Sequence, residues 1–356
     1  MSITDLITAI APVDETARGL AAARQLQLTK PPGALGRLEE IGNQLSAISG
    51  QVPPPLPTPA LVAVFAGDHG VHAAGVTPWP QEVTRQMAAN IALGGAGINA
   101  IARTVGAEVR VVDVGMKAPV AVPGVEDAAV VRGSADFTQG PALTREQAEQ
   151  LIEVGVRVAQ AAAGQGFQSL ATGEVGLANT TVAAALISVF TGRPAALVTG
   201  RGAGSDDEML AHKTEVIDAA ISAHRPDPSD PVGVLAAVGG PEHAATVGLI
   251  LGAARERIPV LVDGVIGCSA ALVAHALCPH VRGYLIAGHD GAEPGVRAAL
   301  DHLALEPVLS LGMRLGEGTG AAMALPLVTA SAAILRDMAT FDEAAVSERT
   351  DEQPQE

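Results

Sequence analysis

Residues 169–190 read SLATGEVGLANTTVAAALISVF, and this stretch decides the fold. A short aliphatic run, Ser169–Thr172, is followed by a turn of small and polar residues. The turn leads into a long apolar segment, Val182–Phe190, whose composition favours a helix. A mostly apolar strand, a glycine-containing turn and an apolar helix in this order are typical of a parallel sheet that is covered by helices.

The same pattern recurs along the chain, because short aliphatic runs repeatedly precede glycine- or aspartate-rich turns and alanine-rich segments. We therefore expect an α/β fold with a parallel, Rossmann-like sheet and helices on both faces. Ligands of such folds bind at the carboxyl ends of the strands, so the polar turns are the expected place for chemistry. The other predicted strands are Leu61–Phe65, Val109–Val114, Ala196–Thr199, Val260–Val262 and Gly283–Ala287.

Both ends of the chain differ from the middle and predict a small helical subdomain. Residues 1–50 are helical and amphipathic apart from a break at Lys30–Gly33, and residues 320–347 again have a helical pattern. The last residues are polar and acidic, which favours disorder. The predicted parts are a helical segment at 1–58, an α/β catalytic domain at 59–319, a helical segment at 320–347 and a disordered tail at 348–356.

Composition limits the possible partners. The chain has 356 residues, of which 48% are hydrophobic, so it can bury a large core. Its 22 Lys and Arg residues against 38 Asp and Glu residues give a formal net charge of -16, which disfavours nucleic acid and anionic membranes as partners. An anionic substrate must therefore be held by a local group of hydrogen-bond donors.

Several features predict a cytoplasmic protein. Cys268 and Cys278 are too few for a disulfide framework or a zinc cluster and fit a reducing compartment. Residues 1–20 lack the basic and then apolar pattern of an export signal. The longest apolar stretch, Val260–Leu277, is interrupted by Asp263 and two glycines, so we expect a strand, a turn and a helix there instead of a membrane span.

The turn after the strand at 169–172 is the first candidate binding site. Backbone N–H groups at a helix start, together with threonine hydroxyls, can bind an anion, although a simple helix cap is the alternative. A cap does not explain Glu174, a carboxylate between two glycines. The candidate nucleotide-binding residues of this turn are Gly176, Ala178, Asn179, Thr180 and Thr181.

Later turns offer further candidates. Gly202, in the Gly200–Gly204 run, would let a backbone approach a phosphate closely, and Lys213 could supply a positive charge or lie on the surface. Asp263, His289 and Gly291 follow two more predicted strands, where they fit ribose and pocket-wall roles or are ordinary structural turns.

The last motif is LSLGMRLGEGTG at 309–320. Glu317 lies between two glycines that leave room for a planar ligand, and the apolar side chains of Met313 and Leu315 could exclude water from it. Burial raises the proton affinity of a carboxylate, which suits a general base. A glutamate that only stabilises a helix N-terminus is the alternative interpretation.

Two other motifs carry weaker predictions. The Gly67–Gly70 turn contains Asp68 and His69, but these are adjacent and no second ligand pair follows at a metal-like spacing, so we expect no metal there. The glycine-rich stretch Gly94–Asn99 resembles a dinucleotide-binding turn, but it lacks a preceding strand, and close backbone packing explains it better.

Taken together, the segments at 30–39 (KPPGALGRLE), 173–181 (GEVGLANTT) and 314–320 (RLGEGTG) resemble the nicotinate-nucleotide:dimethylbenzimidazole phosphoribosyltransferases of cobalamin synthesis. The resemblance spans nearly the whole chain. It implies transfer of a phosphoribosyl group from nicotinate mononucleotide to a benzimidazole, without a cofactor or a metal, by a homodimer.

The resemblance also implies roles for individual residues. Glu317 would be the general base and Glu174 a second acidic residue, while the 176–181 turn, Gly202 and Lys213 would hold the nucleotide. The residues that would line the benzimidazole pocket are Pro78, Trp79, Pro80, Gln86, Met87 and Leu315.

Two other functions remain possible from the sequence. A nicotinamide-dependent oxidoreductase would require an acidic residue at the end of the second strand of a fingerprint unit. A non-catalytic nucleotide-binding protein would bind nicotinate mononucleotide but release no nicotinate when a benzimidazole is added.

Overall fold

The structure is a computed structural model that describes residues 2–347, which form two compact units. The larger unit contains residues 2–12 and 57–326, and the smaller contains residues 13–56 and 327–347. The sequence placed all of 1–58 in one helical segment and began the next at 320, so both boundaries differ from those in the structure. The tail predicted at 348–356 lies outside the described residues.

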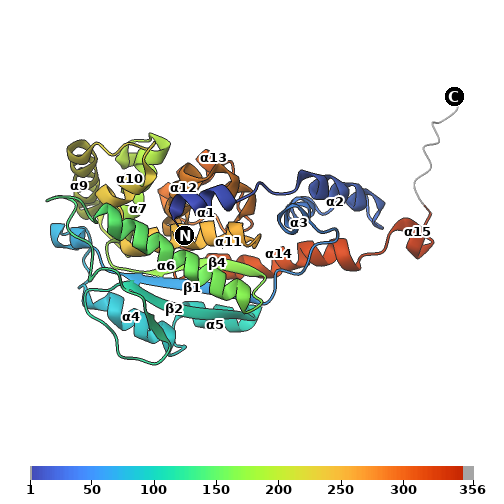
Figure 1. Cartoon of the computed structure of the whole chain (residues 1–356), viewed down its shortest axis with the longest axis horizontal. Helices are drawn as coiled ribbons and strands as arrows, with labels where there is room; N and C mark the ends of the chain where they lie inside the picture. The colour runs from blue at the N-terminus through green and yellow to red at the C-terminus, as the bar shows by residue number, and fades with distance from the viewer. Residues whose placement is uncertain (1, 348–356) are drawn as a thin grey trace. The chain divides into compact units, whose positions relative to one another are not determined.

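The larger unit is built on a six-stranded sheet in which every neighbouring pair is parallel (Figure 1). The strand order is β3-β2-β1-β4-β5-β6, so the order reverses direction between β1 and β4. All residues of β1 are buried, as expected for a strand covered on both faces. The strands are β1 (Ala60–Gly67), β2 (Ala107–Gly115), β3 (Val125–Asp127), β4 (Ser169–Val175), β5 (Val260–Val262) and β6 (Leu285–Ala287).

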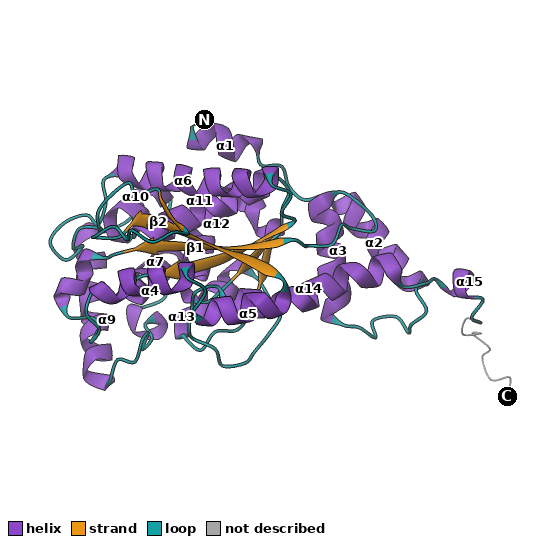
Figure 2. Cartoon of the chain, turned by 90° about the horizontal axis from the view of Figure 1, so that it is seen from below, coloured by secondary structure: helices purple, strands orange, loops and turns teal. Residues whose placement is uncertain are grey.

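Helices follow most strands, and the α/β fold expected from the sequence is confirmed. In the larger unit these are α1 (Ile3–Ala9), η1 (Gly70–Ala74), α4 (Glu82–Ala92), α5 (Gly97–Val105), α6 (Arg145–Gly164), α7 (Asn179–Thr191), α8 (Ala195–Val198), α9 (Asp207–His224), α10 (Pro231–Val238), α11 (Pro241–Arg255), α12 (Val265–Leu277), η2 (Pro279–Tyr284) and α13 (Pro294–Leu303). Helices α6 and α11 lie on one face of the sheet, and α4 and α5 lie on the other (Figure 2).

The strand predicted at Ala196–Thr199 is wrong, because these residues form the short helix α8 and its cap. Pro194 precedes the helix, and the backbone N–H of Thr199 donates to the Ala195 carbonyl at 2.9 Å. A four-residue aliphatic run fits a buried helical turn as well as a strand. In the predicted strand Gly283–Ala287, only Leu285–Ala287 is extended.

The first helix belongs to the larger unit. His280 Nδ1 lies 3.0 Å from the Ile10 carbonyl, and the Tyr284 hydroxyl donates to the Ala11 carbonyl at 2.9 Å. These bonds fasten the segment after α1 to η2, which explains why residues 2–12 leave the small subdomain in which the sequence placed them.

The smaller unit contains α2 (Glu15–Gln27), α3 (Arg37–Ser49), the end of α14 (Thr319–Asp337) and α15 (Phe341–Ala344). The break between α2 and α3 is held by a nearly buried ion pair in which Lys30 Nζ lies 2.7 Å from Glu39 Oε1. The same oxygen accepts the backbone N–H of Leu35 at 3.0 Å. The 30–39 motif therefore forms a closed turn.

Helix α14 is, among the described residues, long and apolar enough to cross a membrane by length and composition alone. Of its most apolar window, 56% is buried inside the protein. Core helices of soluble proteins share this composition, so the helix is weak evidence for a membrane span.

Helices α6 and α11 approach each other through glycines. A Cβ atom added at Gly155 of α6 would lie 1.8 Å from the Ala245 carbonyl oxygen, and one at Gly248 of α11 would lie 1.9 Å from the Ile152 carbonyl oxygen. Both obstructing atoms are backbone atoms, so neither can rotate away. The close packing of this helix pair therefore requires glycine at positions 155 and 248.

We predict that Gly155→Ala lowers the free energy of unfolding by at least about 1–3 kcal/mol, because the added methyl group must push two helices apart. Gly164→Ala in the same helix is the matched control, since nothing lies within 4 Å of its added Cβ. The control should be neutral or stabilise by up to about 1 kcal/mol. Urea denaturation of both variants tests this, and equal stability of the two would contradict the packing described here.

Candidate active site

A cavity of about 390 Å³ lies at the carboxyl ends of β4, β5 and β6. Strand β4 borders the point where the strand order reverses, between β1 and β4. Open α/β sheets bind ligands outside the carboxyl ends of the strands at such a point. The predicted site residues that line it are Glu174, Gly176, Asn179, Thr180, Gly202, Asp263, His289, Gly291, Trp79, Met87, Leu315 and Glu317.

A smaller cavity of about 40 Å³ shares part of this lining. Of the predicted residues, Gly176, Ala178, Asn179, Thr180 and Lys213 line it. The remaining four line neither cavity: Thr181 is buried in α7, whereas Pro78, Pro80 and Gln86 are exposed.

Glu317 is held in an unusual backbone conformation inside the larger cavity. Its φ of 61° is in the left-handed region, which costs free energy for a residue other than glycine. Its side chain is nearly buried, and Oε2 accepts the backbone N–H of Ile98 at 3.0 Å. Burial raises the pKa of Glu317, and the nearby Asp263 adds to this, while the Ile98 hydrogen bond opposes it.

The glycine-rich stretch at 94–97 packs closely, as the sequence suggested, and its partner is the Glu317 loop. A Cβ atom at Gly97 would lie 2.7 Å from Leu315 Cδ2 and 3.4 Å from Glu317 Oε2. The glycine thus lets the N-terminal end of α5, with its free N–H groups, approach the carboxylate. The sequence offered no signal for these contacts, nor for the hydrogen bond between Ile98 and Glu317, which are 219 positions apart.

Glu174 links the Glu317 loop to the start of α7. Its Oε1 accepts the backbone N–H of Glu317 at 3.3 Å, and its Oε2 accepts from the Asn179 side-chain amide. Burial raises the pKa of Glu174 to about 8, with additional effects from the charges of Glu242 and Asp263. Burial therefore favours the neutral form of Glu174 more than that of an ordinary glutamate.

Asp263 accepts hydrogen bonds from the backbone that directly follows Glu317 in the chain. Its Oδ1 accepts the N–H groups of Gly320 at 2.8 Å and Ala321 at 2.9 Å, and its Oδ2 accepts that of Gly318 at 3.3 Å. These are donors at the start of α14 that have no partner within the helix. In this geometry the Asp263 carboxylate positions the Glu317 loop, a contact that a ribose role does not require.

Lys213 reaches the smaller cavity from α9. Its Nζ donates to Thr180 Oγ1 at 2.7 Å and to the Gly200 carbonyl at 3.1 Å. Burial lowers the pKa of Lys213 to about 8, although the neighbouring Glu293 opposes the change. Because the N-terminal end of α7 also borders this cavity, its donors and the lysine charge suit an anion the size of a phosphate.

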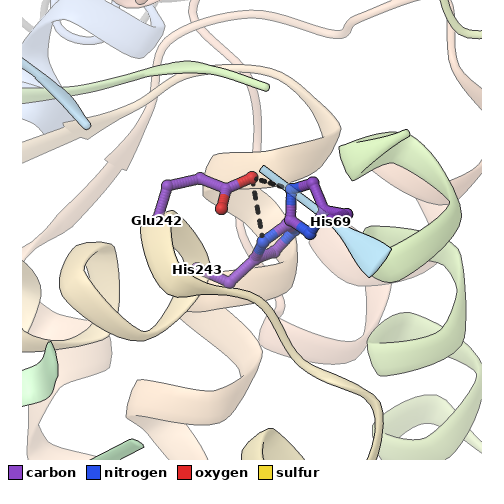
Figure 3. A group of neighbouring side chains, drawn as sticks. All are labelled: His69, Glu242 and His243. Atoms are coloured by element: carbon purple, nitrogen blue, oxygen red, sulfur yellow. Dashed lines mark hydrogen bonds and ion pairs between the residues drawn. The ribbon is translucent and has the colours of Figure 1, made fainter. Parts of the chain in front are cut away.

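His69, Glu242 and His243 form a buried group (Figure 3). Glu242 and His69 lie against Gly176, directly after β4. Helix α11 supplies Glu242 and His243, so sequence spacing alone could not connect them with His69. Glu242 Oε1 lies 2.6 Å from His69 Nε2 and 3.4 Å from His243 Nδ1.

The shorter of these separations is a hydrogen-bond distance. Two tetrahedral zinc ligands would lie roughly 3.3 Å apart, given bonds of about 2.0–2.1 Å. As placed, Glu242 and His69 therefore form a hydrogen-bonded pair that fastens the end of β1 to the start of α11.

The fold places two adjoining cavities at the carboxyl ends of the strands, where α/β proteins of this class bind small ligands. Residues 10–346 match the family described as "Phosphoribosyltransferase", and the chain belongs to that family.

Individual relatives agree with this assignment. The chain is 52% identical to the nicotinate-nucleotide–dimethylbenzimidazole phosphoribosyltransferase of Salinispora tropica, with 98% of this chain and 100% of that protein covered. It is 49% identical to the protein of the same name from Geobacter sulfurreducens, with 97% and 98% covered.

A solved structure is also similar. The crystal structure of the nicotinate-nucleotide–dimethylbenzimidazole phosphoribosyltransferase from Thermus thermophilus matches with a TM-score of 0.89 and 42% identity. The match covers 94% of this chain and 100% of that one.

We predict that Glu242→Gln destabilises the protein in a pH-dependent way. Burial by itself would raise the pKa of Glu242, but His69 and His243 outweigh burial and lower it to about 2. A lowered pKa stabilises the fold above the ordinary carboxyl pKa, and this stabilisation disappears as the pH falls toward 2. The variant should therefore lose on the order of 3 kcal/mol at neutral pH and progressively less below about pH 4.5. Denaturant unfolding at pH 7 and pH 3.5 measures the difference, and a pH-independent loss would refute the role of the two histidines in stabilising the Glu242 carboxylate.

Proposed function

We propose that the protein transfers the 5-phosphoribosyl group of nicotinate mononucleotide to 5,6-dimethylbenzimidazole or a similar base. The products are the α-ribotide, α-ribazole 5'-phosphate, and nicotinate. The observation that carries this proposal is the Glu317 carboxylate, which lies nearly buried in an apolar cavity that adjoins a lysine-containing anion site. The names of the relatives from three organisms support the same reaction.

The smaller cavity is the proposed site of the nucleotide phosphate. Lys213 supplies the charge, and the N-terminal end of α7, with Thr180, supplies hydrogen-bond donors. The ribose then extends into the larger cavity past Asn179, which lines both. A chain with a net charge of -16 needs such a local site to hold a phosphate.

The base is proposed to bind where the larger cavity is apolar. Trp79, Met87 and Leu315 are among the apolar side chains that line this cavity, and Glu317 is near Leu315 on the same loop. Pro78, Pro80 and Gln86 do not line it, so in this chain the proposal assigns the pocket wall to the first three side chains.

The chemistry requires a positioned base more than an acid. The pyridinium of nicotinate mononucleotide is already a good leaving group, so its departure needs little proton donation. When one benzimidazole nitrogen attacks C1′, the ring becomes cationic unless the other N–H is removed, and Glu317 accepts that proton. Attack opposite the leaving nicotinate inverts the anomeric carbon and converts a β-nucleotide into an α-ribotide.

Glu174 is proposed to position Glu317 without adding a second negative charge. Because its pKa is raised to about 8, the neutral form of its carboxyl group is favoured. It accepts the Glu317 backbone N–H and contacts Asn179, so it joins the Glu317 loop to the start of α7.

The oxidoreductase interpretation fits less well. An NAD-binding unit needs a free carboxylate at the end of the second strand, where this chain has Asp113. Asp113 accepts the backbone N–H groups of Gly115 at 3.0 Å and Met116 at 2.7 Å, and Arg132 Nη1 lies 2.8 Å from it. Its carboxylate is therefore already bonded within the protein, whereas an NAD-binding unit needs it to accept a hydrogen bond from a ribose hydroxyl.

We further propose that the protein is a cytoplasmic homodimer. Two buried free cysteines, Cys268 and Cys278, are consistent with a reducing compartment. The family resemblance supports the homodimer, and both substrates are small molecules.

The test is to mix purified protein with nicotinate mononucleotide and 5,6-dimethylbenzimidazole and to analyse the products by mass and by the coupling of the anomeric proton. We expect an α-ribotide and one equivalent of nicotinate from the wild type. Glu317→Gln should lower kcat about 10²–10⁴-fold and leave nucleotide affinity nearly unchanged, because it removes only the proton acceptor.

Lys213→Met is the matched control for this variant. It should raise the KM for nicotinate mononucleotide more than it lowers kcat, because it removes a phosphate contact. Binding of the nucleotide without release of nicotinate in the presence of the base would indicate a non-catalytic protein. Equal loss of affinity and turnover in Glu317→Gln would contradict the general-base role.

A further inference from the structure

A single short segment, residues 77–79, contributes a lining residue to each of the two cavities. Thr77 lines the smaller cavity, whereas Trp79 lines the larger. Ala203, in the loop of residues 200–205, lines both. Two loops that are far apart in the sequence therefore meet where the proposed phosphate and base sites adjoin.

One hydrogen bond from Trp79 joins these two loops, and two others hold Trp79 to residues shortly before it in the chain. The indole Nε1–H donates to the Ala203 carbonyl at 2.9 Å. The backbone N–H of Trp79 donates to Thr77 Oγ1 at 3.4 Å, a weaker bond, and His72 Nε2 lies 2.8 Å from the Trp79 carbonyl. Although 48% of Trp79 is exposed, its polar groups are all engaged, so the ring is held in place by specific bonds.

The 200–205 loop borders both cavities. Arg201, Ala203 and Ser205 line the smaller one, and Gly202 and Ala203 line the larger one. Gly202 and Gly204 have φ values of 53° and 108°, a backbone conformation that glycine adopts readily. The loop is also tied to the larger cavity, because the Gly202 N–H donates to Glu293 Oε1 at 2.9 Å and Arg314 Nη1 donates to the Gly202 carbonyl at 3.2 Å.

Helix α9 provides a second connection between the same parts. Lys213 reaches the smaller cavity, and its neighbour His212 places Nε2 2.7 Å from the Ala74 carbonyl, at the end of η1 and shortly before Trp79. An anion that binds Lys213 therefore contacts the same helix, α9, that is hydrogen-bonded through His212 to the segment preceding Trp79.

From these contacts we infer that Trp79 is a positioning residue that couples the two substrate sites. An anion in the smaller cavity fixes Thr77 and the 200–205 loop more firmly, and the indole bond to Ala203 passes this restraint to the ring that forms a wall of the larger cavity. The base therefore binds more tightly to a wall that the phosphate has stabilised. This inference rests on the proposed function, and the coupling is reciprocal, so the base must also tighten phosphate binding.

The chain itself supplies the probe, because Trp79 is its only tryptophan. Titration of the wild-type protein with inorganic phosphate should change the tryptophan emission, even though Trp79 does not line the smaller cavity. Calorimetric titration with 5,6-dimethylbenzimidazole should give a Kd that is about fivefold or more lower in saturating phosphate than in its absence.

The deciding variant is Trp79→Phe, which keeps an aromatic ring and removes the N–H donor. We expect phosphate to bind it as tightly as the wild type, while the effect of phosphate on base affinity falls below about twofold. Leu93→Ala is the control, since Leu93 is exposed, lines neither cavity and should leave the coupling intact.

Three results would overturn the inference: tryptophan emission that does not respond to phosphate, coupling that persists in Trp79→Phe, or phosphate that does not bind at all. The proposed function is judged separately by product formation. If the wild type makes the α-ribotide but shows no coupling, only the inference about Trp79 fails.

Discussion

The Asp263 carboxylate is the contact on which the site depends. It comes from the end of β5 and accepts three backbone N–H groups around the start of α14, at Gly318, Gly320 and Ala321. Since helix starts have donors without intrahelical partners, one buried carboxylate both caps the helix and fixes the turn before it. That turn contains Glu317 in its left-handed conformation, so the strain is balanced by bonds that the sheet supplies.

The environment of each carboxyl group then determines what it can do. Glu317 is nearly buried but retains one hydrogen bond from Ile98, which keeps its carboxylate available as a proton acceptor. Burial raises the pKa of Glu174, and the nearby charges of Glu242 and Asp263 raise it further, so its neutral form is favoured. The close approach of Glu174 to the Glu317 loop requires glycine at position 316, because a Cβ atom there would lie 2.1 Å from Glu174 Oε1.

Local sequence patterns predicted the parallel sheet and the turns at its carboxyl edge, because burial on both faces leaves apolar runs that end in glycine and aspartate. The same reasoning failed at Ala196–Thr199, where four aliphatic residues form a helical turn. The contacts of Gly97 with Glu317 and of His69 with Glu242 join distant residues, and no local pattern indicates such partners. Asp263 was predicted as a candidate site residue, but its bonds to the Glu317 loop could not be foreseen from its own turn.

The central claim is that the Glu317 carboxylate faces the ring nitrogen of a base bound in the larger cavity. A crystal structure of the protein with 5,6-dimethylbenzimidazole tests this most directly. We predict a Glu317 carboxylate oxygen within about 3.2 Å of one ring nitrogen, with the ring between Trp79 and Leu315. A base bound elsewhere, or a Glu317 side chain turned toward solvent, would contradict it.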